Sequence, residues 1–203
     1  MSTEVGSRVP SQHTRKFLRF VEEHAAILRQ RTGAGPTDKL DPQRLVRELK
    51  LVIAWPDNIA ALAPEDRAYL SNVDPRTWSG MGGVLPDGRL LVLLHPGQTP
   101  ERATVTTMEE VAHQYYHHQP TKLSIHPAGL QRREYDVQAE AEAYWTAAAV
   151  LLPSRAVAMA VWQGVSAQEL ALQYGVSVEL VEFRIKVHRL WRDYRAQTER
   201  KVG

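Results

Sequence analysis

The 203-residue chain contains no cysteine. Disulfide bonds and zinc sites built on thiolates are therefore excluded, and any metal ion must be bound by His, Asp or Glu side chains. No apolar run reaches the roughly 18 residues that a membrane-spanning helix needs. The polar segment Met1–Ser11 lacks the apolar core of a signal peptide. These absences lead us to expect a cytoplasmic protein with no membrane partner.

An excess of charge of one sign is also missing. The chain has 25 Lys and Arg residues against 23 Asp and Glu residues, so its formal net charge is only +2. This value alone does not indicate a nucleic-acid partner. Hydrophobic residues make up 43% and charged residues 24% of the chain, which excludes a disordered or collagen-like protein. The length allows one large domain or two small ones.

The apolar pattern predicts a mostly helical α+β chain with a small sheet. Leu51–Trp55 is a candidate strand. Two apolar segments joined through Asp87-Gly88 predict a β-hairpin over residues 80–95. Helical spacing and helix-stop signals predict helices over residues 11–31, 42–49, 100–118 and 135–152.

The C-terminal segment predicts a helix, a short turn and a second helix. Ser166 and Ser177 are candidate N-caps, and Gly175 lies in the turn between the helices. The second helix is expected to run to about Thr198. It carries basic residues that could meet DNA phosphates, namely Arg184, Lys186, Arg189, Arg192 and Arg195. The apolar residues between them favour the other interpretation, a packed helix with a solvated basic face.

Residues with metal-binding or catalytic chemistry gather in the predicted helix 100–118. Positions four apart share one face of a helix, so Glu109, His113 and His117 form a line of potential ligands. Glu110 lies beside that line, about 100° round the helix axis. The neighbouring His118 is expected to be exposed.

The predicted helix 135–152 adds the carboxylates of Glu140 and Glu142. Two helices that offer carboxylates and imidazoles are a suitable frame for a metal ion. Without a metal, Glu109, Glu110 and Glu140 would bring like charges together, and at least one of their pKa values should rise. The alternative interpretation is that these residues form solvated helix faces. His126 falls in a predicted loop and is not expected to contribute.

The spacing in the first helix comes close to the H-E-x-x-H motif, in which two His residues bind zinc and the Glu is the general base. Zinc lowers the pKa of its bound water to about 7, and the Glu takes the proton. Glu110 and His113 stand where the motif has its Glu and second His, whereas Glu109 replaces the first His. A carboxylate can bind zinc, but it makes the metal a weaker Lewis acid.

With these motifs, the segment from Trp78 to Pro153 resembles the ImmA/IrrE family of metallopeptidases. The opening region, with Asp41–Leu45 and Leu51–Ile53, extends the resemblance to residues 11–155. The pieces that match, in the order of the family, are the hairpin from Ser79-Gly80 through Asp87-Gly88 to Leu90–Leu94, the segment Thr106–His113, the segment Glu140–Ala143, and the apolar stop at Leu151-Leu-Pro153.

The resemblance implies a zincin-like metallopeptidase domain over residues 11–155. A flexible tail, 1–10, would precede it, and a helix-turn-helix-like segment, 156–203, would follow it. Carried over by position, Glu110 would be the general base, His113 and Glu140 would bind the metal, and Glu109 would take the remaining ligand position. His117 and Glu142 are additional candidate ligands. The cofactor would be Zn²⁺, another divalent ion, or none if Glu109 prevents binding.

Relatives in this family cleave helix-turn-helix repressors in stress responses and in the induction of mobile elements. The resemblance therefore implies metal-assisted hydrolysis of a peptide bond in such a repressor. The alternative is a catalytically inactive regulator that binds a repressor or DNA, with the C-terminal segment as the candidate DNA contact. Residue Glu109 separates the two hypotheses.

Overall fold

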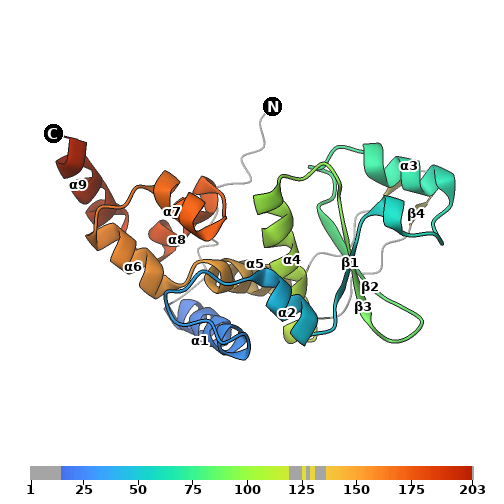
Figure 1. Cartoon of the computed structure of the whole chain (residues 1–203), viewed down its shortest axis with the longest axis horizontal. Helices are drawn as coiled ribbons and strands as arrows, with labels where there is room; N and C mark the ends of the chain where they lie inside the picture. Colours follow the sequence, from blue (N-terminus) through green and yellow to red (C-terminus); the bar gives the residue numbers. More distant parts are fainter. Residues whose placement is uncertain (1–14, 119–124, 127–128, 131–135, 203) are drawn as a thin grey trace. The chain divides into compact units, whose positions relative to one another are not determined.

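The computed structural model describes residues 15–118, 125–126, 129–130 and 136–202 (Figure 1). This part of the chain is mostly helical with a small three-stranded sheet, which confirms the α+β prediction. The predicted tail, 1–10, lies outside the described residues. The chain divides into two compact units. Residues 43–144 form one unit, and the residues up to Pro42 form the other together with those from Trp145 onward.

The unit of residues 43–144 is built around strand β3, which pairs in parallel with β1 and antiparallel with β2. The β2–β3 pair is the predicted hairpin, and Gly88 in its turn has a φ of 82°, a value that favours glycine. The elements of this unit are α2 (Pro42–Glu48), β1 (Val52–Ala54), the 3₁₀ helix η1 (Pro56–Asn58), α3 (Pro64–Asn72), β2 (Gly80–Val84), β3 (Leu90–Leu94), α4 (Pro100–Tyr115), β4 (Ile125–His126), β5 (Gly129–Leu130) and the start of α5 (Val137–Leu151).

Helix α4 packs against the hairpin strands β2 and β3. The Thr99 hydroxyl accepts a hydrogen bond from the backbone N–H of Arg102 at 3.3 Å and caps the helix. A Cβ atom added at Gly80 would lie 2.5 Å from Cγ2 of Thr106. Only glycine permits this close approach. It places the face of α4 that carries Thr106 and Glu110 beside strand β2.

Helix α4 ends at Tyr115, three residues before the predicted end. His117 adopts a φ of 54°, and the backbone N–H of His118 donates to the carbonyl of His113 at 3.0 Å. This is the usual way in which a helix terminates through a left-handed residue, here a histidine in place of the more common glycine. The chain therefore turns back over the last turn of α4.

In the second unit, the described residues form a helical bundle. It comprises α1 (Arg15–Arg31), the remainder of α5, α6 (Ser154–Trp162), α7 (Ala167–Tyr174), α8 (Val178–Val187) and α9 (Trp191–Val202). The predicted N-cap at Ser166 is confirmed. It is part of a capping box, in which Ser166 and Glu169 exchange backbone and side-chain hydrogen bonds. Gly175, with a φ of 69°, ends α7, and Ser177 caps α8.

The prediction of one continuous helix from Ser177 to about Thr198 is wrong. Helix α8 ends at Val187, and α9 begins at Trp191. Arg189 between them has a φ of 61°, which an α-helix cannot accommodate. The backbone N–H of Leu190 donates to the carbonyl of Ile185 and closes the end of α8.

Arg184 is buried in the second unit, so it is not available to contact DNA phosphates. Its Nε donates to the carbonyl of Leu152 at 2.9 Å, and its Nη2 donates to Oε1 of Glu22 at 2.5 Å. His188 Nε2 lies 3.2 Å from the same Glu22 oxygen, within the distance of an ion pair but not aligned for a hydrogen bond. Glu22 thus balances the charge of a fully buried guanidinium.

Within the described residues, no single helix has the length and apolar composition to cross a membrane. Helices α5 and α6 meet these two criteria only when they are counted as a pair, and they are bent by 54° at the break between them.

Candidate functional site

The predicted site residues come from α4 and from the start of α5, both within the unit of residues 43–144. Asp136 accepts hydrogen bonds from the backbone N–H groups of Gln138 and Ala139, at 3.0 and 3.1 Å, and thereby fixes where α5 begins. One turn later, Glu140 Oε2 lies 3.7 Å from Nε2 of His113. The structure thus brings together two of the three predicted ligands.

Glu109 lies in a partly buried, negatively charged environment. Burial, the largest cause, and the charges of Glu110 and Glu140 together raise its pKa from 4.5 to about 7, although Arg102 and His113 act in the opposite direction. This confirms the expectation that like charges crowd at the site. A bound cation would favour the ionised carboxylate, because it would offset the repulsion.

The same negative charge affects the pKa of the His113 imidazole. Burial lowers its pKa, but the Glu140 carboxylate, which lies within ion-pair distance of Nε2, raises it, and Glu110 and Glu109 add to that effect. The net result is a raised pKa. The site therefore attracts positive charge, whether from a proton on His113 or from a metal ion.

Glu110 extends towards the edge of the sheet. A Cβ atom added at Gly82 would lie 3.0 Å from Glu110 Oε2. Gly82 is an exposed residue of β2, and among the described residues β2 pairs only with β3. The carboxylate therefore lies next to the main chain of an edge strand, the place where an extended peptide can add to a sheet.

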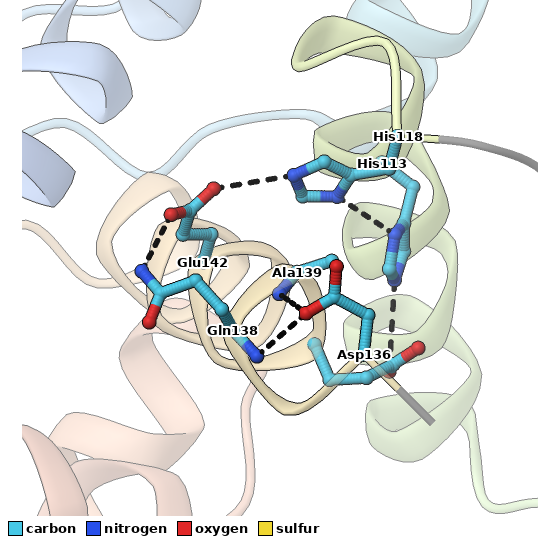
Figure 2. A network of polar contacts seen from close by, with 7 residues as sticks. His113, His118, Asp136, Gln138, Ala139 and Glu142 are labelled. Atoms are coloured by element: carbon cyan, nitrogen blue, oxygen red, sulfur yellow. Dashed lines mark hydrogen bonds and ion pairs between the residues drawn. The ribbon is translucent and has the colours of Figure 1, made fainter. Parts of the chain in front are cut away.

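His118 was expected to be exposed, and this prediction is wrong. Its side chain is only 13% exposed. Figure 2 shows its imidazole between His113 and Glu142, with Nδ1 at 3.0 Å from Nδ1 of His113 and Nε2 at 3.2 Å from Oε2 of Glu142. The carboxylate of Glu142 also accepts a hydrogen bond from Gln138 Nε2 at 2.6 Å.

Sequence reasoning missed His118 because it assumed a regular helix. A residue five positions after His113 would point about 140° away from it. The helix instead ends at Tyr115, and the turn at His117 brings His118 back. His117 itself is exposed. His126 lies in β4 and pairs with Gly129 instead of lying in a loop, because a two-residue strand is too short to leave an alternating pattern.

The donor set fits a divalent cation in part. Two ligands of a tetrahedral ion with bonds of about 2.1 Å lie about 3.4 Å apart, and the 3.7 Å between His113 and Glu140 is close to this separation. In the part of the chain that the structure describes, however, no three or more His, Asp or Glu side chains are arranged to hold a metal ion. The ligand set of Glu109, His113 and Glu140 remains a prediction.

Comparison with known families decides the relationship. The model of the IrrE N-terminal-like domain, peptidase M78, matches residues 68–186, more than half of the chain. The chain belongs to the ImmA/IrrE family. The match includes α4, the start of α5 and the hairpin, which are the elements on which the resemblance was based.

Among solved structures, the chain is similar to a transcriptional regulator from Mycobacterium tuberculosis, with 15% sequence identity and a TM-score of 0.49. The similarity covers 80% of this chain and 45% of that chain, so this chain spans less than half the length of that structure. No curated protein matches the chain.

Proposed function

We propose that this ImmA/IrrE-family chain is a metal-dependent regulatory peptidase that hydrolyses a peptide bond in a helix-turn-helix transcriptional repressor. The observation that carries the proposal is the position of Glu110 beside the edge strand β2. One turn further along the same helix, His113 faces Glu140. The proposal thus assigns proton acceptance to a carboxylate beside the strand that an extended substrate would join, and metal binding to the pair one turn further along the helix.

In this proposal His113 and Glu140 hold the metal ion, and Glu109 is the third ligand. A bound Zn²⁺ or similar ion would supply Lewis-acid chemistry to the attacking water and the scissile carbonyl. The carboxylate of Glu110 takes a proton from that water and passes it to the leaving amine. The main chain of β2 pairs with the substrate and holds the scissile bond beside Glu110.

A second candidate is a regulator that binds a repressor or DNA without cleaving it. It is favoured by the finding that the described residues contain no ready group of three metal donors. A contribution of the C-terminal segment to DNA binding rests on Lys186, Arg189, Arg192 and Arg195, because Arg184 is buried. In either case the partner would be met in the cytoplasm, where such repressors act.

The test combines metal analysis with a cleavage assay. The full chain is purified without chelator, its Zn²⁺ and Mn²⁺ contents are measured, and it is incubated with a helix-turn-helix repressor encoded beside its gene. Products are located by mass spectrometry. Glu110→Gln should lower the rate about 100-fold or more, because it removes the proton acceptor.

The matched control is Glu101→Gln, a change of the same kind in the first turn of the same helix, which should leave the rate unchanged. Undiminished cleavage by the Glu110 variant would exclude Glu110 as the base. If the metal-loaded wild type binds the repressor without cutting it, the second candidate is correct.

A further inference from the structure

The hydrogen bond between His113 and His118 has one donor and one acceptor, and the contacts of His118 with Glu142 determine which is which. Glu142 accepts a hydrogen bond from Gln138 on one oxygen and lies against His118 with the other. An ionised carboxylate carries no proton and can only accept hydrogen bonds. The Nε2 of His118 must therefore carry the proton and donate it to Glu142.

The contacts form a row from Glu142 through His118 to His113. The proton on Nε2 of His118 determines the direction of the bond between His118 and His113. A neutral imidazole carries one proton, so His118 with its proton on Nε2 has a lone pair on Nδ1. That lone pair lies 3.0 Å from Nδ1 of His113, which must then be the donor. With its own proton on Nδ1, a neutral His113 presents the lone pair of Nε2 to the side where Glu140 lies, at 3.7 Å.

We propose that His118 is a positioning residue that holds His113 in the Nδ1–H tautomer, so that Nε2 is ready to bind a metal ion. The proposal rests on the proposed function, since it concerns the same site. Histidine ligands of metals usually donate their second N–H to a fixed acceptor, which sets the tautomer and the ring orientation. Here the acceptor is a second imidazole, which Glu142 orients in turn.

The backbone is built to permit this arrangement. His118 reaches His113 only because His117 adopts a left-handed conformation, with a φ of 54°. For a residue other than glycine this conformation is sterically unfavourable. The side chain of His118 is also packed, because its ring stacks on that of Tyr116 with the ring centroids 5.4 Å apart. The position of His118 is therefore specified by several contacts.

The direct test is the tautomer of His113 in the metal-free full chain. Protein labelled with ¹⁵N-histidine is examined at pH 8 by long-range ¹H–¹⁵N correlation, and the His113 signals are identified by their loss in His113→Gln. We expect the proton on Nδ1 in the wild type. In His118→Leu the His113 signals should move towards the Nε2–H form, which an unconstrained imidazole favours. A wild-type His113 with its proton on Nε2 would overturn the proposal.

Two further variants separate positioning from simple packing. His118→Gln retains a carbonyl oxygen that can accept from His113 and an amide that can donate to Glu142, so it should restore the Nδ1–H form. His117→Asn changes an exposed neighbour to a residue that tolerates a left-handed backbone and should leave the spectrum unchanged. Should the leucine variant not fold, Glu142→Ala tests the same row from its far end and should release the same constraint.

Zinc affinity is the second readout, measured by competition with a chromogenic chelator. His118→Leu should weaken binding about 10- to 100-fold, and His118→Gln should recover most of the loss. Equal losses in His118→Leu and His118→Gln would contradict a positioning role for His118. If the wild type binds no zinc, the metal-dependent part of the proposed function fails, while the tautomer of His113 still decides the present inference.

Discussion

Replacement of Glu22 by Gln should remove the charge that balances the buried Arg184. Glu22 lies on α1, and its Oε1 accepts from Arg184 and approaches His188. Burial raises the pKa of the carboxyl, but His188 and Arg184 lower it by more, to about 2 from an ordinary value of 4.5. The side chain is only 20% exposed, so solvent screens these interactions little.

The size of the effect follows from the pKa shift. A lowering from 4.5 to about 2 at about 1.4 kcal/mol per unit corresponds to about 3 kcal/mol in the free energy of unfolding. Because the folded-state pKa is the lower one, ionised Glu22 contributes this stability above pH 4.5. The contribution is lost as the pH falls towards 2. Loss of one partner of a buried ion pair typically costs a similar amount.

The assay is urea unfolding of the wild type and Glu22→Gln at several pH values between 7 and 2. The variant should be less stable by about 3 kcal/mol at pH 7, and the difference should close at the acid end. Glu23→Gln is the matched control, because Glu23 forms an exposed pair with Arg19 on the same helix and should cost less than about 1 kcal/mol. A loss that persists unchanged at pH 2 would refute the electrostatic reasoning.

Three further predictions concern function. Glu109→His should tighten zinc binding in the chelator competition, because an imidazole relieves the crowding of carboxylates; if the wild type already holds stoichiometric zinc tightly and the variant adds nothing, Glu109 does not impair the site. Gly82→Ala should lower the cleavage rate about tenfold by displacing the general base, whereas Gly83→Ala faces open space and should have little effect; equal rates in the two variants would contradict this placement. If the C-terminal segment binds DNA, replacing Arg189 and Arg192 with Ala should weaken binding and flatten its salt dependence in a titration, and absence of binding by the intact chain at low salt would leave these residues no such role.

The features that the sequence predicted correctly depend on neighbouring residues. The hairpin turn at Asp87-Gly88 and the N-cap at Ser166 are local patterns that depend on a few adjacent residues. The order of motifs across α4 and α5 likewise indicated the family that the comparison confirmed.

The features that the sequence could not predict depend on exceptions to local rules or on distant partners. His117 and Arg189 end helices in a conformation that glycine usually adopts, so neither residue type marks the break. The burial of Arg184 depends on Glu22, which lies 162 positions earlier in the chain. The contact of His118 with His113 follows from such an unmarked helix end, and periodicity therefore placed His118 in solvent.

The glycines of β2 have a consequence for the selection of substrates. Three of the five residues in Gly80–Val84 are glycine, so the strand offers main-chain groups and very few side chains to a peptide beside it. Pockets that read individual residues of a target need side-chain walls, and this strand supplies almost none. If the proposed cleavage is correct, a target is chosen by whether it can offer an unfolded, extended segment. A regulatory signal then acts by unfolding that segment of the target, with no change in this chain.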